Sequence, residues 1–135
     1  MNHLTRKGGE RLPPVLSEHT SIYLQIAKML EDGILRGIYP EETQVPSTNE
    51  LARTLRINPA TGAKGLNLLV EEGILYKRRG LGMFVAQGAA RRILAKRREE
   101  FLAQYVKPLV VEARKLGLTA EELQAMLTDA CQQEE

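Results

Sequence analysis

The side chains that could do chemistry in this sequence are mainly cations, and they gather in the middle of the chain. Residues 53–98 carry 11 Lys or Arg and only 2 Asp or Glu, a local charge of +9. The segments on either side are acidic, with −2 over residues 1–52 and −5 over residues 99–135. Ammonium and guanidinium groups bind phosphate oxygens, so this local basicity predicts a polyanionic partner, foremost nucleic acid. A solvated surface with clustered charge is the alternative.

Residues suited to covalent or metal chemistry are scarce. The two histidines, His3 and His19, lie near the start of the chain, and the one cysteine, Cys131, lies near its end. Because no hydrolase triad, phosphate-binding loop or metal-ligand spacing occurs, the sequence predicts no enzyme, no metal site and no cofactor. One cysteine forms no internal disulfide, which suits a reducing cytoplasm. With no signal peptide and no apolar run of about 18 residues, no membrane association is expected, and residues 1–18 are predicted to be a flexible tail.

Three helices are predicted before and within the basic region. The first spans Ser21–Arg36, where apolar residues recur every three or four positions. The second spans Ser47–Arg56 and opens with a capping box that ends on Glu50. The third, the predicted recognition helix, spans Asn58–Glu72 and has Pro59 at its first helical position. Two short helices joined by a tight turn are typical of a helix-turn-helix, although any helical hairpin looks alike.

A β-hairpin is predicted directly after the third helix. Ile74–Arg78 and Met83–Val85 are strand-like, and the glycines of Arg79–Gly82 permit the positive φ angles of a hairpin turn. A helix-turn-helix followed by a hairpin with three consecutive cations is a winged arrangement. The predicted fold class is therefore mostly α with a small β-hairpin wing, and residues 19–87 are predicted to form a winged helix-turn-helix domain.

Residues 88–135 are predicted to add a C-terminal two-helix dimerisation arm. A long helix spans Ala89–Leu116, with a kink about one turn before Pro108, and the capping box of Thr119 and Glu122 begins a last helix. Each helix has a face too apolar to stay in water. The residues predicted to contact a partner chain are Phe101, Tyr105, Leu109, Leu123, Met126 and Leu127. Packing against the chain's own winged domain is the alternative.

The stretch from Ser21 to Val85 resembles the DNA-binding domain of the GntR family of bacterial transcription regulators. The matching segments are Ile22–Ile26, Gly37–Pro40, Val45–Ser47, Glu50–Ala52, Leu55, Ile57–Pro59, Thr61, Lys64, Leu69, Glu72–Leu75 and Gly80–Val85. Lys107–Leu109 and Glu112–Leu118 resemble the short helical tail of the YtrA-like subfamily. The resemblance implies a homodimer formed through this tail. The larger effector-binding domains of other branches do not fit in the 47 residues from Ala89 onward.

The sequence departs from the family pattern at four positions. Asn49 stands where the family usually has an arginine that contacts phosphate, and Glu42 stands where glycine is common. Gly62 and Gly65 replace a valine and an alanine within the third helix, at a cost of roughly 1 kcal/mol each relative to alanine. Either these glycines permit close approach to the DNA groove, or they leave the helix locally soft until DNA orders it.

Residues placed to contact DNA lie on three elements. The start of the third helix would enter the major groove, where Thr61 and Lys64 would choose the sequence. The wing arginines suit a narrow minor groove or flanking phosphates, and the second helix suits phosphate contacts. The predicted DNA-binding residues are Ser47, Asn49, Arg53, Asn58, Ala60, Thr61, Lys64, Arg78, Arg79 and Gly80. Helix capping alone would also explain Ser47 and Asn58.

These features predict a sequence-specific transcription regulator, a repressor, that binds a palindromic operator in double-stranded DNA as a homodimer. An unknown small-molecule effector stays open, since no residue points to a site for it. The alternative function is a winged-helix module that binds protein or RNA without duplex specificity. RNA-binding modules usually expose aromatic side chains. This chain has only six aromatic residues, and Tyr23, Phe84 and Phe101 occupy positions predicted to lie in the core.

Overall fold

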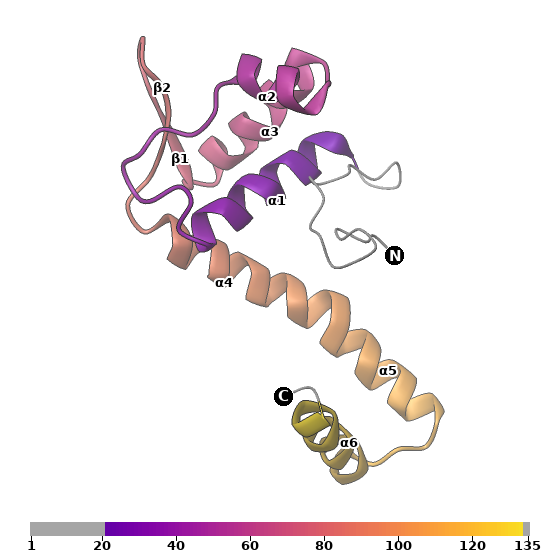
Figure 1. Cartoon of the computed structure of the whole chain (residues 1–135). Helices are drawn as coiled ribbons and strands as arrows, with labels where there is room; N and C mark the ends of the chain where they lie inside the picture. Colours follow the sequence, from indigo (N-terminus) through magenta and orange to yellow (C-terminus); the bar gives the residue numbers. More distant parts are fainter. Residues whose placement is uncertain (1–20, 134–135) are drawn as a thin grey trace. The chain divides into compact units, whose positions relative to one another are not determined.

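The computed structural model describes residues 21–133, so the predicted tail over residues 1–18 lies outside the described range. The elements are α1 (Ile22–Leu35), α2 (Thr48–Leu55), α3 (Pro59–Glu71), β1 (Leu75–Arg78), β2 (Gly82–Val85), α4 (Ala89–Phe101), the π-helical turn η1 (Leu102–Val106), α5 (Lys107–Lys115) and α6 (Ala120–Gln133). The predicted fold class, mostly α with one small hairpin, is confirmed (Figure 1). Contacts divide the chain into two compact units between Ile93 and Leu94.

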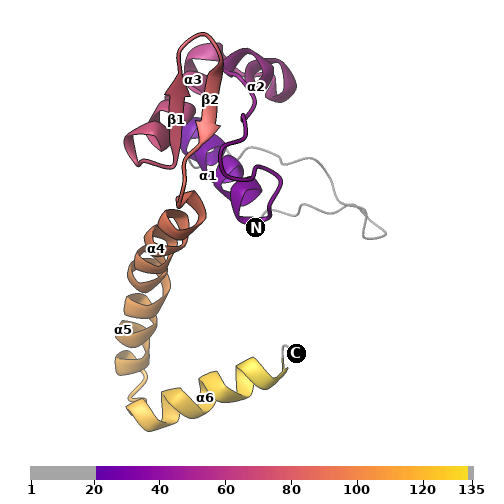
Figure 2. The ribbon, with the colours of Figure 1, turned by 90° about the vertical axis from the view of Figure 1, so that its left-hand side faces the viewer.

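In the first unit, α1, α2 and α3 pack around one apolar core, and the hairpin lies beside α3 (Figures 1 and 2). Ile26, Leu30 and Ile34 of α1 are buried because a spacing of four places them on one helical face. The largest fully buried side chains are Ile26, Val45, Leu66, Leu69, Ile74, Leu75, Val85 and Ile93. They come from α1, α3, the segment before α2, the wing and the start of α4, so a single core holds the wing against the helices.

Side-chain caps begin both helices of the helix-turn-helix. The Ser47 hydroxyl accepts a hydrogen bond from the Glu50 N–H (3.1 Å), and the Glu50 carboxylate accepts one from the Ser47 N–H (2.9 Å). The Asn58 side chain accepts a hydrogen bond from the Ala60 N–H (2.8 Å). Between the helices, Arg56 turns the chain in the left-handed region at φ 54°. The predicted capping box and the predicted cap of the third helix are confirmed.

Gly62 and Gly65 are buried on the inward face of α3. A Cβ added at Gly65 would lie 2.9 Å from the Tyr23 carbonyl oxygen and 3.1 Å from the nearest Ile26 side-chain atom, both on α1. A Cβ added at Gly62 would lie 3.6 Å from the Thr48 carbonyl oxygen of α2, an ordinary contact distance. The expectation that these glycines permit close approach to DNA is therefore wrong, because they face the other helices. Gly65 lets α1 and α3 pack closely.

The wing is an antiparallel hairpin in which Leu75 pairs with Val85 and Arg78 pairs with Gly82. The segment before α2 also pairs with β2, which the sequence did not predict. The Val45 N–H donates to the Met83 carbonyl (3.0 Å), and the Val85 N–H donates to the Thr43 carbonyl (3.0 Å). Residues 42–45 therefore cover the second edge of β2 and connect the wing to the start of α2.

In the second unit, η1 and α5 continue directly from α4, and α6 follows after a short turn. The Lys107 N–H donates to the Leu102 carbonyl five residues earlier, which is the π-helical pattern. This irregular turn lies in the stretch before Pro108, where a kink was predicted. Pro108 has no N–H to donate to a carbonyl one turn earlier, and this interrupts the regular pattern of helical hydrogen bonds. The capping box of Thr119 and Glu122 is confirmed, with hydrogen bonds of 2.9 and 3.1 Å.

The second unit has almost no core of its own. Among residues 94–133, only Ala113 is buried. Phe101 was expected in the core, but it is 57% exposed, so that expectation is wrong for the single chain. Its ring packs against the ring of Tyr105, with centroids 5.5 Å apart, and Tyr105 is exposed as well. Several exposed apolar side chains on neighbouring helical turns are typical of surfaces that a partner covers.

Candidate nucleic-acid interface

The outward face of α3 is defined by helical geometry. Successive residues are turned by about 100°, so the buried residues mark the inward side. The opposite side carries Ala60, Lys64, Asn67 and Glu71, all exposed. Thr61 lies between the two sides and is half-buried. The helix therefore presents one ammonium, one amide and one carboxylate to solvent, beside small apolar side chains.

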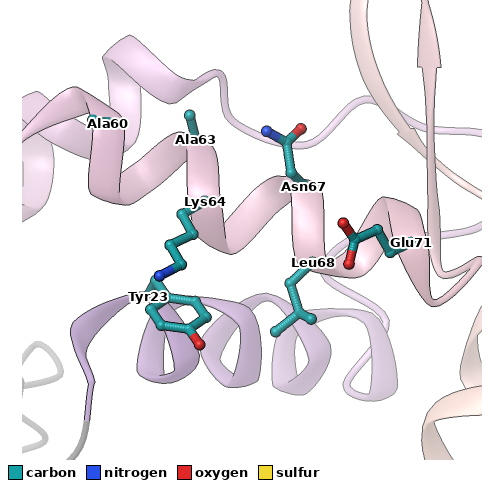
Figure 3. A pocket seen from close by; sticks show the side chains of 7 residues that line it. All are labelled: Tyr23, Ala60, Ala63, Lys64, Asn67, Leu68 and Glu71. Atoms are coloured by element: carbon teal, nitrogen blue, oxygen red, sulfur yellow. The ribbon is translucent and has the colours of Figure 1, made fainter.

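An open hollow of about 450 Å³ lies along this face, between α3 and Tyr23 of α1. Figure 3 shows Ala63 and Asn67 on the side of α3 that points away from α1, and Lys64 on the side toward it. The Lys64 ammonium lies 4.1 Å from the centroid of the Tyr23 ring, a cation–π contact. Because Ala60 and Ala63 are small, nothing on α3 hides the Asn67 amide from an approaching surface.

The wing tip carries cations on a braced turn. Lys77, Arg78 and Arg79 are exposed, and the Arg78 guanidinium lies 4.8 Å from the centroid of the Phe84 ring. Gly80 turns the chain at φ +77°, and no atom beyond Gly80 and its two chain neighbours lies within 4 Å of the place where its Cβ would be. The Gln44 side-chain amide donates to the Leu81 carbonyl (2.6 Å). The Gln44 side chain thus fixes the turn, while the residues at its tip stay exposed.

Tyr76 connects the wing to the turn before α2. Its hydroxyl donates a hydrogen bond to the Glu42 carboxylate. This bond raises the pKa of Tyr76 above its ordinary value, because ionisation would remove the donor and place two anions together. Glu42 has a left-handed backbone at φ 66°, a conformation that glycine adopts at no steric cost. The turn therefore tolerates an unfavourable residue, whose side chain makes a contact that glycine could not.

The start of α2 exposes the three residues predicted to contact phosphates there: Ser47, Asn49 and Arg53. Ser47 already caps the helix, and its backbone N–H and hydroxyl hold the pKa of Glu50 below the ordinary value of a glutamate. The Arg53 guanidinium adds a smaller attraction. The Asn49 side chain makes no hydrogen bond within the described part of the chain, so its amide is available to a ligand.

All ten predicted DNA-contact residues belong to the first unit, and all except Thr61 are exposed. The sequence prediction missed two residues of this surface, Asn67 on α3 and Gln44 beneath the wing. Helical periodicity could have found Asn67, which follows Lys64 by three positions. No local signal marks Gln44. Across residues 21–133, no cluster of His, Cys, Asp and Glu could hold a metal ion, and none of the helices there has the length and apolarity that crossing a membrane requires.

Comparisons with known proteins identify the family. The sequence profile of "Bacterial regulatory proteins, gntR family" matches residues 22–85. The chain is similar to the HTH-type transcriptional repressor YtrA of Bacillus subtilis, at 31% identity over 104 residues that cover 77% of this chain and 79% of YtrA. It is also similar to the HTH-type transcriptional regulator YhcF of the same organism, at 30% identity over 76% of this chain and 83% of YhcF.

A solved structure agrees with these sequence matches. The crystal structure of a transcriptional regulator of the GntR family from Bacteroides thetaiotaomicron has a TM-score of 0.74 to this chain. It is 35% identical to this chain, and the match covers 84% of this chain and 99% of the other. The resemblance that the sequence suggested, including its YtrA-like character, is confirmed. The chain therefore belongs to the GntR family of bacterial regulatory proteins and is a transcription regulator, not an enzyme.

Proposed function

We propose that this regulator is a repressor that binds a palindromic operator in duplex DNA as a homodimer. The observation that carries the proposal is the exposed face of α3, which stands in the same compact unit as a cationic wing tip. The major groove admits one helix, and its base edges display distinguishable donors and acceptors. The relative YtrA is named a repressor, which supports repression here. Such a regulator would act in the cytoplasm, where bacterial DNA lies.

Each part of the surface has a separate physical task in this proposal. The outward residues of α3 meet base edges, which supplies sequence choice. Arg78 and Arg79 at the wing tip reach flanking phosphates or a narrow minor groove, and Asn49 and Arg53 on α2 reach phosphates. Phosphate contacts set the register and make the affinity fall with salt. Since α3 carries a single cation on its outward face, much of the affinity must come from the wing and from a second subunit.

The second unit supports the homodimer. Its predicted contact residues Phe101, Tyr105, Leu109, Met126 and Leu127 are exposed, and Leu123 is half-buried. Burying such side chains is worth roughly 25 cal/mol per Å² of apolar surface. A second copy of the chain offers the same apolar faces, and a two-fold interface would set two α3 helices against two half-sites about one helical turn apart.

Selection of bound DNA from a random duplex pool tests the proposal. The expected result is a palindromic motif whose two half-sites are about one helical turn apart. Gel shifts at increasing salt then measure the phosphate contacts. Arg78→Ala with Arg79→Ala removes two cations from each subunit, so binding should weaken severalfold or more and the salt slope should fall by about 4 for the dimer, roughly 1 per lost contact.

The matched control for the wing variant is Arg114→Ala with Lys115→Ala, which removes the same two charges from the end of α5. It should leave the salt slope unchanged. Equal binding of duplex DNA and structured RNA, or no binding of either, would overturn the proposed function in favour of a protein- or RNA-binding module.

A further inference from the structure

Asn67 occupies the centre of the outward face of α3. It lies seven residues after Ala60 and three after Lys64, so the three positions fall within about 60° of one another around the helix axis, on its exposed side. The Asn67 amide is exposed and makes no hydrogen bond within residues 21–133. Figure 3 shows it pointing away from α1, whereas the neighbouring Lys64 extends toward Tyr23. The Asn67 amide is therefore a polar group of this face that forms no hydrogen bond with a neighbouring side chain.

The spacing of this face matches the geometry of base readout. A recognition helix that lies in the major groove can read base edges with residues at i, i+3, i+4 and i+7. On α3 these positions are Ala60, Ala63, Lys64 and Asn67. From Ala60 to Asn67 the helix rises about 10 Å, or about three base-pair steps of about 3.4 Å. The two alanines allow the helix to approach the groove floor, which brings a short amide within reach.

The chemistry of the amide selects the base. Asparagine offers a donor and an acceptor side by side, which matches N7 and the N6 amino group of adenine in the major groove. Thr61, expected to choose the sequence, is half-buried at the side of the helix and has less freedom to reach a base. We infer that Asn67 is a specificity-determining residue that reads one adenine in each half-site. This inference rests on the proposed binding of duplex DNA.

The test compares the duplexes selected from a random pool by the full-length wild type and by Asn67→Ala. The wild type should select an adenine at one fixed position of each half-site, and the variant should lose that preference while the rest of the motif stays. Affinity for a single wild-type half-site should fall roughly 5- to 150-fold, the equivalent of about 1–3 kcal/mol for one bidentate base contact, and the palindrome, with two such contacts, should lose more. Affinity for unrelated duplex should not change, because Asn67 carries no charge.

Asn49→Ala is the matched control, since it makes the same substitution at an exposed position of α2. It should weaken all sequences alike and leave the selected motif intact. The thermal unfolding midpoint of Asn67→Ala should not fall, because alanine is the better helix former at an exposed position. If the wild type selects a motif and Asn67→Ala selects the same one with the same ratio of specific to non-specific affinity, this inference is wrong and the proposed function stands. If the wild type selects no duplex at all, both fail.

Discussion

Gly62 and Gly65 share one helix face but meet different surroundings. At Gly65 an added methyl would press on the Tyr23 carbonyl oxygen at 2.9 Å, so α1 would have to move. Gly65→Ala should therefore lower the free energy of unfolding by about 1–3 kcal/mol, as overpacking does. At Gly62 the added methyl would make ordinary contacts of 3.6 Å or more. Gly62→Ala should be neutral or should raise the free energy of unfolding by up to about 1 kcal/mol through helix propensity.

Urea unfolding of the two variants beside the wild type measures both effects, and each variant is the control for the other. Equal stabilisation by the two alanines would show that α1 and α3 have room at Gly65, contrary to the distances there.

The hydrogen bond between Tyr76 and Glu42 makes a prediction about alkaline pH. The bond raises the pKa of Tyr76 in the folded state, so folding favours the protonated phenol. Its contribution to stability is fully present below the ordinary pKa of tyrosine and is lost as the pH rises through the raised, folded-state pKa. Glu42→Gln removes the negative charge and should return the pKa of Tyr76 toward its ordinary value.

Ultraviolet titration of tyrosinate in the folded protein measures this pKa. Tyr76→Phe removes one tyrosine from the titration and so assigns the signal. The hydrogen bond would be absent in solution if the tyrosines of the wild type and of Glu42→Gln titrated identically.

At the scale of the element, the capping box of α2 couples helix stability to acid pH. Ser47→Ala removes the hydroxyl that accepts from the Glu50 N–H and should cost about 1 kcal/mol of stability at neutral pH. In the wild type the pKa of Glu50 is lowered. The contribution of Glu50 is therefore fully present above the ordinary glutamate pKa and is lost as the pH falls through the lowered, folded-state pKa. The variant should show a smaller loss over that range.

Denaturant unfolding at neutral and acid pH measures both effects. Thr119→Ala is the matched control, because it removes the same hydroxyl contact from the capping box of α6. It should leave unchanged the unfolding of the first unit, which carries the wing and is called the winged unit below. A Ser47→Ala variant with the stability and pH dependence of the wild type would mean that the box does not stabilise α2.

The elements differ in how far the sequence could predict them, and the reason is the range of the interactions. Caps and turns depend on residues within four positions of each other, which is why the starts of α2, α3 and α6 agree with prediction. The pairing of residues 42–45 with β2 joins segments about forty residues apart, and no periodicity marks it. The role of Gly65 is equally non-local, because only the position of α1 shows that a Cβ at residue 65 would have no room.

The residues of the candidate site also differ in how far the sequence could predict them. The polar residues at the helix starts and the wing tip are recognisable from their types and spacing, because caps and hairpin turns have local signatures. The direction in which α3 residues point depends on which face packs against α1 and α2. Helical periodicity could have added Asn67 to the candidate residues beside Lys64. Only the packing of α3, in contrast, shows that Thr61 is half-buried, which the sequence analysis did not predict.

For the whole molecule, the apolar faces of the second unit predict the oligomeric state. Phe101→Glu with Leu127→Glu places charges on two of the exposed apolar residues. If these residues meet a second copy, burying unpaired carboxylates would break the dimer, and light scattering should give half the wild-type mass. Ile38→Glu is the control, since Ile38 is 56% exposed in the winged unit and Phe101 is 57% exposed. This variant should keep the wild-type mass.

The same variants connect assembly to DNA binding. Two half-sites held by one dimer bind with an avidity that exceeds single-site binding by about 10²–10⁴-fold, so the double variant should lose affinity for the full operator on this order. Its affinity for an isolated half-site should match that of the wild type, because the winged unit has a core of its own. An unchanged mass for the double variant would mean that these apolar faces do not hold two copies of the chain together. If that mass were the mass of a monomer, the wild type itself would bind the palindrome no more tightly than expected from independent binding of two half-sites, because no avidity would join them.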